Sequence, residues 1–527
     1  MVSKKRQQAR WTLRVALTAA LVASASGSWA IVTGLDLVQL LQHPAFTSHS
    51  DQGFYLALIT QGQRITAFVT AFRLGDKLFE TELNALDGAG ANVGHGLRFT
   101  HVPRADLKGP GEWMSHVPPR DTGPNATSCL SCHGRPARDG AGLIPSNVLR
   151  DPLRSGNVAK FIERNPPHLF CTGAIQRLAE EMTTELQKLR SEATAAACAE
   201  GRASRDLTAK GVGFGRLAVT RTATGPCKVQ VDTAEVQGVD EDLVVRPFRW
   251  KGNVASLRDF VRTAANSELG MQAVELVGAG VDGDFDGVVN ELTVGDVTAL
   301  TVYLAAQPRP TTRVELAGLG IIPPLLDAEK QSIARGDQVF RDVGCASCHT
   351  QRLTLDDPVF AEPSHHPSFR DAVFPAGQNP VAEGIDPEHP ISFDLTREQP
   401  ENVVKSHEDD RVVVRLGALQ KDDSGKAVVE LFGDLKRHDM GPGLADPIDE
   451  GGIKASVFLT RSLWGVGSTA PYMHDGRAST LAEAILEHGG EGAAARDAFK
   501  RLTTEQQKDL IAFLNNLVLV KYNAGGS

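Results

Sequence analysis

Two short segments of the chain carry cysteine and histidine at a spacing that suits haem chemistry. They are Cys129-Leu-Ser-Cys132-His133 and Cys345-Ala-Ser-Cys348-His349. Two thiols three positions apart can bond to the two vinyl groups of one haem, and the adjoining histidine is then placed to ligate the iron. Zinc ribbons and redox disulfides also use C-x-x-C pairs, but the histidine that directly follows both pairs argues against them. We therefore predict two covalently bound haem c groups, with His133 and His349 as iron ligands.

The residues that follow each motif recur in the same order, which indicates an internal duplication. Gly252 in the first half and Gly476 in the second half each precede a leucine by five positions, and a helix is predicted to follow. In the second half His488 lies twelve residues after the glycine, whereas the same count in the first half reaches Ala264, which cannot bind iron. We therefore expect the second haem to be six-coordinate and the first to keep an open position. The two halves also close with the similar patterns Leu300-x-x-Tyr303-Leu304 and Leu510-x-x-Phe513-Leu514.

Composition and proline placement set the expected architecture. The chain has 41% apolar and 23% charged residues, which is typical of globular proteins, and its 51 glycines and 28 prolines predict long loops. The expected fold is mainly α, with two cytochrome c-like haem domains, long irregular loops and insertions. One long helix is predicted over residues 174–197. The expected boundaries are a signal peptide at 1–30, an N-terminal haem domain at 31–310, a proline-containing linker at 311–325 and a C-terminal haem domain at 326–522.

The amino terminus is typical of an exported protein. Residues 1–30 contain five basic residues, no acidic ones and an apolar stretch, which predicts a signal peptide and a periplasmic location; an uncleaved membrane anchor is the alternative. Loss of these five positive charges changes the formal net charge from −9 to −14. This charge favours a basic small redox protein or cytochrome as electron donor, and no signature of nucleic-acid binding is present. In an oxidising compartment Cys198 and Cys227 can form a disulfide that leaves Cys171 free, although the sequence does not determine the pairing.

Three segments of the second half resemble one protein family. They are Thr469-Ala-Pro-Tyr472-Met-His474-Asp-Gly476-Arg, His438-Asp-Met440-Gly-Pro and residues 481–490. Together with the haem motifs, they resemble the bacterial di-haem cytochrome c peroxidase superfamily, and more closely its di-haem oxidoreductase branch, once described as thiol oxidoreductases. In the peroxidases, the position fourteen residues beyond the histidine of the His-Asp-Gly segment carries the distal ligand of the electron-transfer haem. The resemblance therefore implies His488 as that ligand and a bis-histidine haem, with Met440 as the alternative.

The same resemblance implies two functional residues in the first half. Phe248-Arg-Trp250-Lys-Gly252 is similar to the segment whose tryptophan lies between the two haems. Asn266-Ser-Glu268-Leu-Gly-Met271 is similar to the segment with the catalytic glutamate. By this likeness Trp250 would relay electrons and Glu268 would act as general acid and base over the open haem. A packed tryptophan and a surface glutamate are the alternatives.

An acidic loop in the first half has ligands that suit calcium. The segment Asp282-Gly-Asp284-Phe-Asp286-Gly287 places carboxylates at alternate positions before a glycine, as in an EF-hand loop. The twelfth position is Thr293 instead of a bidentate glutamate, with Asn290 and Glu291 before it. The sequence therefore predicts calcium as a further cofactor at a non-standard loop, and a solvated acidic turn is the alternative.

These observations favour an oxidoreductase over a simple electron carrier. We expect a periplasmic di-haem c-type cytochrome, peroxidase-like, that passes electrons from the C-terminal haem to an open N-terminal haem and acts on peroxide or on a small-molecule or protein substrate. The alternative is a non-catalytic electron-transfer cytochrome c with two six-coordinate haems, which His168 would produce by closing the first haem. Residues 36–125 and 190–245 have no counterpart in the peroxidases, so the reaction stays open. Thiol oxidation would depend on Cys171, and the sequence does not predict an oligomeric state.

Overall fold

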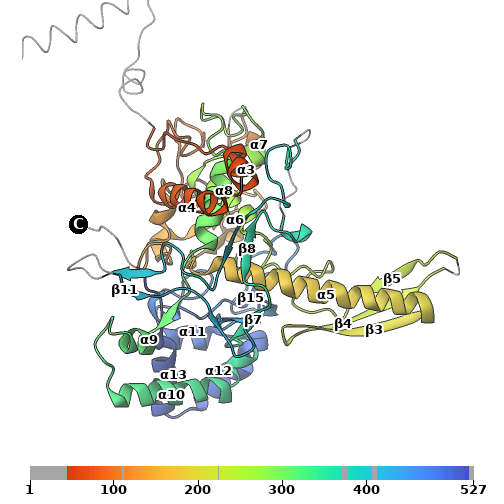
Figure 1. Cartoon of the computed structure of the whole chain (residues 1–527), viewed down its shortest axis with the longest axis vertical. Helices are drawn as coiled ribbons and strands as arrows, with labels where there is room; N and C mark the ends of the chain where they lie inside the picture. Colours follow the sequence, from red (N-terminus) through yellow and green to blue (C-terminus); the bar gives the residue numbers. More distant parts are fainter. Residues whose placement is uncertain are drawn as a thin grey trace, which may run out of the picture. The chain divides into compact units, whose positions relative to one another are not determined.

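Helices and short strands alternate along the described part of the chain (Figure 1). This computed structural model describes residues 44–109, 112–223, 225–370, 374–375, 378–405 and 412–521, so the predicted signal peptide at 1–30 lies outside the described residues. The α-helices are α3 (Gln52–Thr60), α4 (Arg64–Glu80), α5 (Thr172–Glu200), α6 (Leu257–Ala264), α7 (Val274–Val277), α8 (Val294–Ala305), α9 (Arg313–Gly318), α10 (Asp327–Asp342), α11 (Leu481–Glu487), α12 (Ala493–Arg501) and α13 (Thr504–Asn516).

The strands form small sheets in which neighbouring strands pair antiparallel. The expectation of a mainly α fold was therefore wrong. Segments expected as irregular loops are partly buried, and buried backbone N–H and C=O groups need hydrogen-bond partners, which these ladders supply. The strands are β1 (Val148–Arg150), β2 (Ile162–Arg164), β3 (Arg202–Ala209), β4 (Val212–Arg221), β5 (Val229–Asp232), β6 (Thr311–Thr312), β7 (Leu353–Leu355), β8 (Val359–Glu362), β9 (Ile391–Asp394), β10 (Val403–Lys405), β11 (Val412–Arg415), β12 (Gln420–Lys421), β13 (Ala427–Val429), β14 (Arg437–Asp439), β15 (Val457–Leu459) and β16 (Leu517–Val518).

The two halves repeat one close helix crossing. In the first half α4 packs on α8, and in the second half α10 packs on α13. A glycine faces the partner helix in both: a Cβ on Gly75 would lie 2.6 Å from the Cβ of Tyr303, and a Cβ on Gly336 would lie 2.7 Å from the Cβ of Phe513. Tyr303 and Phe513 are the residues that the predicted duplication matches. The shared crossing therefore supports the duplication and shows that α4 is the counterpart of α10.

The helices that lead to Ala264 and His488 begin in equivalent ways. Ser256 caps α6 and Thr480 caps α11, each by accepting a hydrogen bond of 3.2 Å from the backbone N–H three residues later. Both helices begin at the leucine that follows the repeated glycine by five positions. Ala264 is the last residue of α6, and His488 directly follows α11. Ala264 and His488 therefore occupy equivalent positions, at the ends of corresponding helices in the two halves.

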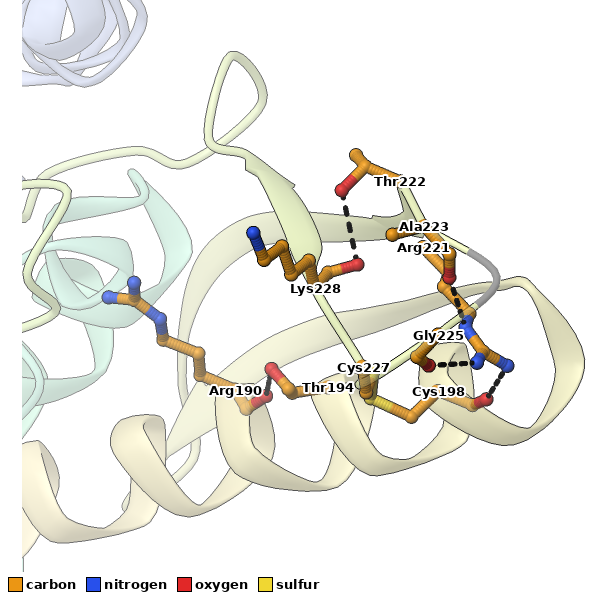
Figure 2. The surroundings of a disulfide bond; sticks show 9 residues. All are labelled: Arg190, Thr194, Cys198, Arg221, Thr222, Ala223, Gly225, Cys227 and Lys228. Carbon is orange, nitrogen blue, oxygen red and sulfur yellow. Dashed lines mark hydrogen bonds between the residues drawn. A yellow bond between two sulfur atoms is a disulfide. The ribbon is translucent and has the colours of Figure 1, made fainter.

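The insertion at residues 190–245 forms the end of α5 and a three-stranded sheet. The helix expected over 174–197 extends to Thr172–Glu200, and β3 and β4 lie along it, with β5 next to β4 (Figure 1). A disulfide joins Cys198 to Cys227, which confirms the pairing that the sequence left open (Figure 2). Beside it, the Arg221 guanidinium donates hydrogen bonds to the carbonyls of Cys198, Ala223 and Gly225.

The segment expected as a linker, residues 311–325, has structure of its own. It contains β6 and α9, and β6 pairs with β16. The backbone N–H of Val314 also donates a hydrogen bond to the side-chain oxygen of Asn516 at 3.0 Å. Residues Ala45–Ser527 group as one packed unit, and the division into two haem domains stays a prediction. In the part of the chain that the structure describes, no helix has both the length and the apolar character needed to cross a membrane.

Candidate haem sites and the wall between them

The second haem motif borders a large cavity. The cavity has a volume of about 440 Å³ and is lined by Cys345, Cys348 and His349, together with apolar residues of α10, α11 and α13. The Nδ1–H of His349 donates to the carbonyl of Phe432 at 3.1 Å, which leaves Nε2 free for iron. Burial lowers the pKa of His349 to about 4, so the imidazole is neutral, as a metal ligand must be.

His488 faces His349 in this cavity. Their ring centres are 6.4 Å apart. Two imidazoles bound axially to one metal, each about 2 Å from it, hold their ring centres roughly 6 Å apart. The Nδ1–H of His488 donates to the carbonyl of Ala484 at 2.8 Å, so its Nε2 is also free. The pair therefore has the separation and the two free nitrogens that bis-histidine ligation of a haem iron needs.

Met440, the alternative ligand, lines the same cavity but lies beside His488. Both the Cε of Met440 and the Cδ2 of His488 are 3.2 Å from the place that a Cβ on Gly492 would take. The methionine methyl group thus borders the same part of the cavity wall as His488, whose imidazole is the one that faces His349. This arrangement favours His488 over Met440 as the partner of His349.

Two further residues of this cavity fit a bound haem. The indole N–H of Trp464 is buried and has no hydrogen-bond partner among the described residues. Burial lowers the pKa of Arg461 to about 10, and no carboxylate of the described residues offsets that effect. A haem carries two propionate groups, whose carboxylates would provide partners for both donors. No sequence pattern marks either residue, since each is an isolated side chain outside any motif.

His438 was also missed as a member of the site. Its Nε2 lies 2.8 Å from Asp434 Oδ2, its Nδ1 lies 2.7 Å from Glu491 Oε2, and Cys348 Sγ is 3.9 Å away. Burial opposes the charged form, but the hydrogen bonds to these groups raise the pKa of His438 to about 11. A cationic imidazolium therefore lies beside Cys348, one of the two cysteines predicted to attach the second haem.

The first haem motif borders a smaller cavity of about 160 Å³. The Nδ1–H of His133 donates to the carbonyls of Gly140 at 3.2 Å and Pro167 at 3.0 Å, which leaves Nε2 free for iron. Ala264, the repeat counterpart of His488, lines this cavity and has no atom that could ligate iron. The two sites therefore differ at the place where a distal ligand is expected.

Glu268 lines the first cavity from a π-helical turn, Ala265–Leu269, that continues α6. Such turns occur often at functional sites. The backbone carbonyl of Glu268 accepts hydrogen bonds from Asn125 and Ala126, but its Oε2 is buried and has no partner among the described residues. Burial raises the pKa of Glu268 to about 7, against the opposing effect of nearby arginines such as Arg150. The side chain is therefore a partly protonated acid near neutral pH, and not a solvated surface glutamate.

Trp250 lines both cavities and so forms part of the wall between them. Its indole N–H donates to the carbonyl of Asn165 at 2.9 Å. The Arg461 guanidinium lies 4.9 Å from the centre of its ring, and the ring of His474 lies edge-on at 6.3 Å. The structure thus places Trp250 between the two haem motifs, where the family resemblance implies a relay.

His168 and Cys171 were each considered for a role at the first site. His168 lines both cavities; its Nε2 is 3.0 Å from the carbonyl of Trp464, and its Nδ1 is buried with no hydrogen-bond partner among the described residues, so ligation through Nδ1 stays open. Cys171 is 2% exposed, and burial raises the pKa of its thiol to about 12. Such a thiol is unreactive, which disfavours thiol oxidation.

The acidic loop brings the oxygens of Asp282, Asp284 and Asp286 within 4.8 Å of one another. Glu291, which does not fit the EF-hand spacing, is buried beside them. Burial, together with the neighbouring carboxylates, raises the pKa of Asp284 to about 8 and that of Glu291 to about 10. This crowding of acids is unfavourable unless a cation is bound.

Comparison with known proteins gives one family match. Residues 399–517 match a family described as "Di-haem oxidoreductase, putative peroxidase". No curated protein matches the chain. The match covers β14, β15, Met440, His474 and His488. The three segments on which the family resemblance was based all lie within it.

Several solved structures are similar to parts of this chain. A hydrazine synthase chain of Kuenenia stuttgartiensis has 15% identity and a TM-score of 0.25, and the alignment covers 58% of this chain and 78% of that one. A MauG-like protein associated with microbial copper homeostasis has 14% identity and a TM-score of 0.25, over 66% and 89%. A variant of the di-haem peroxidase BthA from Burkholderia thailandensis has 14% identity and a TM-score of 0.31, over 85% of each chain. At residues 399–517, less than a quarter of its length, the chain is similar to the di-haem oxidoreductases.

Proposed function

We propose that this protein is a periplasmic di-haem oxidoreductase that reduces peroxide at the first site with electrons delivered through the second. The observation that carries the proposal is the carboxyl group of Glu268: its buried Oε2 has no hydrogen-bond partner among the described residues, and it lines a cavity that has Ala264 at the repeat position of His488. An acid and base near an open iron position is the arrangement that peroxide reduction requires.

The cofactors proposed are two haem c groups and calcium. Cys129 and Cys132 would hold one haem, and Cys345 and Cys348 the other, through thioether bonds that match the C-x-x-C spacing. A haem iron supplies one-electron redox chemistry, and an open axial position admits a small oxidant. Calcium would bind at the loop Asp282–Asp286.

Glu268 would move a proton in the first cavity. Its pKa of about 7 means that the carboxylate and the carboxylic acid are both well populated at neutral pH. The carboxylate can take a proton from one peroxide oxygen and return it to the other as the O–O bond breaks. Reduction of one hydrogen peroxide consumes two electrons and two protons and yields two water molecules, and a reduced redox protein would supply the electrons.

Trp250 and the second site would deliver the electrons. Trp250 lies in the wall that the two cavities share, so a packed aromatic ring separates the sites instead of water. The electron donor proposed is a small basic redox protein or cytochrome, because the exported chain has a formal charge of −14 once five positive charges are removed from −9. The reverse direction, in which an organic or protein substrate gives electrons to the first site, would use the same residues.

The test is low-temperature EPR of the purified ferric protein, with and without excess peroxide, on the wild type and on Ala264→His. In the wild type we expect one high-spin signal that peroxide removes. The variant places a histidine at the repeat position of His488, so we expect that signal to become low-spin and insensitive to peroxide. Ala264→Gln, which adds bulk without an imidazole, serves as the control and should stay high-spin.

Two low-spin haems in the wild type, unchanged by peroxide even after one-electron reduction, would instead indicate a non-catalytic electron-transfer cytochrome. If the high-spin signal persists in peroxide, the first haem has an open position but peroxide is not its oxidant.

A further inference from the structure

The acidic loop contains carboxylate oxygens that lack partners although they are buried. Asp284 is 0% exposed, and neither of its side-chain oxygens has a hydrogen-bond partner among the described residues. Asp282 is different, because its two oxygens accept hydrogen bonds from the backbone N–H groups of Asp286 and Gly287. An ionised carboxylate that is removed from water needs a cation or several donors in place of the lost hydration. Asp284 therefore indicates a ligand that the loop is built to hold.

Glu291 provides a third unpartnered oxygen close to the loop. It is 2% exposed; its Oε2 accepts the backbone N–H of Gln272 at 2.6 Å, while its Oε1 has no partner in the described part of the chain. The residue at the EF-hand twelfth position, Thr293, is used elsewhere: it caps α8, and its hydroxyl donates to the carbonyl of Ser50. Glu291 is thus available where Thr293 is not.

The charges around the loop do not balance without a cation. Four carboxylates, those of Asp282, Asp284, Asp286 and Glu291, lie near two arginines. Arg98 pairs with Asp286. Arg120 is buried but donates its hydrogen bonds to Asn266, Ser267 and Thr122 and to no carboxylate. When all four carboxylates are ionised, two negative charges exceed the two arginines, which is the charge that one divalent cation neutralises. Because every candidate ligand is oxygen, Ca²⁺ suits the site better than a transition metal.

We infer that Glu291 completes a calcium site with Asp282, Asp284 and Asp286, and that the bound ion braces the π-helical turn that carries Glu268. The inference deepens the proposed calcium cofactor by naming its fourth carboxylate ligand and its effect on the first haem site.

Two short connections join the ion site to that turn. The first connection runs through Gln272, three residues after Leu269. The backbone N–H of Gln272 donates to Glu291, and its side-chain Oε1 accepts the N–H of Gly283 at 2.9 Å. Its Nε2 donates to the carbonyl of Val117 at 2.8 Å. Gln272 is therefore held by a ligand residue and by the ligand loop at once. A loosened loop would loosen the segment that ends the turn.

The second connection is the irregular segment at residues 88–92. The N–H of Gly90 donates to the carbonyl of Leu269 at 2.7 Å, and the N–H of Asn92 donates to the carbonyl of Asp284 at 3.1 Å. Gly88 leaves no room for a side chain next to Glu291, since an added Cβ would lie 2.6 Å from the Glu291 carboxyl carbon. One continuous segment thus contacts the turn, the loop and Glu291.

The experiment measures calcium and iron by elemental analysis in the haem-loaded protein after dialysis, and then hydrogen exchange of residues 265–272 with and without EGTA. We expect one calcium for every two irons. EGTA should speed exchange of this segment by about tenfold or more, and added Ca²⁺, but not Mg²⁺, should reverse it.

Variants separate the parts of the inference. Glu291→Gln and Asp284→Asn should lose the calcium. Asp422→Asn is the matched control, because Asp422 also accepts backbone hydrogen bonds in a loop, from Ser424 and Lys426, but is exposed; it should keep the calcium. If Glu291→Gln keeps its calcium, Glu291 is not a ligand, although the aspartates of the loop can still bind the ion. If EGTA leaves the hydrogen exchange of residues 265–272 unchanged in the wild type, calcium does not stabilise the π-helical turn. If the wild type contains no calcium, the calcium site itself is wrong, and this conclusion does not depend on the reaction with peroxide.

Discussion

His349 and His488 face each other with ring centres 6.4 Å apart, and each donates its Nδ1–H to a backbone carbonyl. The carbonyl partners, Phe432 and Ala484, hold both rings with Nε2 directed away from the backbone. The pair is therefore preorganised for a metal between the rings, and the first site has no equivalent pair because Ala264 occupies the repeat position.

Replacement of His488 tests its role as axial ligand. In His488→Met, a thioether in place of the imidazole should raise the midpoint potential of the second haem by roughly 0.1–0.3 V, because methionine stabilises the ferrous state. Spectroelectrochemical titration measures this shift. Met440→Leu should leave the potential unchanged, since Met440 packs beside His488. A shift in Met440→Leu with none in His488→Met would make Met440 the ligand.

The pH dependence of the peroxide reaction tests Glu268. Burial raises its pKa to about 7, so the carboxylate that accepts a proton is scarce below pH 7 and predominates above it. The second-order rate constant from stopped-flow mixing should therefore rise with pH through about 7 and level off above it. Glu268→Gln should remove this step and lower the plateau by about 10²–10³-fold, the usual size of a lost acid and base.

Glu192→Gln, on an exposed position of α5, is the control and should keep both the rate and the step. A wild-type rate that is flat between pH 5 and 9, or a Glu268→Gln variant with the wild-type profile, would remove Glu268 from the reaction.

The candidate site residues that lie in short sequence motifs could be predicted from the sequence. His349 comes from the C-x-x-C-H motif and His488 from a fixed count to Gly476. Trp250 and Glu268 come from segments that resemble a family. Each segment folds locally, so its spacing survives in the structure.

Long-range packing could not be predicted in this way. Helix α4 is the counterpart of α10, but residues 81–128 intervene before the first haem motif, so no local count relates them. The surroundings of Arg461 depend on Trp250, which is far away in sequence, and the residue type alone gives no hint of this contact. The small antiparallel ladders were missed for the same reason, since all the described strands except β3 and β4 have only two to four residues, too few to show a measurable alternation.

Replacement of Trp250 tests electron delivery between the sites. Trp250→Phe keeps an aromatic ring but loses the hydrogen bond from the indole to Asn165, and Trp250→Ala removes the ring. We expect electron transfer from the second haem to the first to slow modestly in the phenylalanine variant and by about tenfold or more in the alanine variant, while peroxide binding at the first site is unchanged. Rapid mixing of half-reduced protein with peroxide, followed at both haem bands, measures this. Trp113→Phe, at a buried tryptophan outside both cavities, is the control.

Arg258 tests how the core holds the first site. It is 2% exposed, pairs with Glu275 and with Glu362 at 2.8 Å, and donates to the Thr298 hydroxyl at 2.8 Å, so it links α6 to α7, β8 and α8. Arg258→Ala would remove the guanidinium that pairs with both buried carboxylates and should lower the free energy of unfolding by about 3–5 kcal/mol. Urea unfolding followed by far-UV circular dichroism measures this loss. Arg216→Ala, which removes an exposed ion pair with Asp206, should leave the midpoint unchanged. Equal midpoints for the two variants would mean that the buried network does not hold α6, and therefore the turn that carries Glu268, in place.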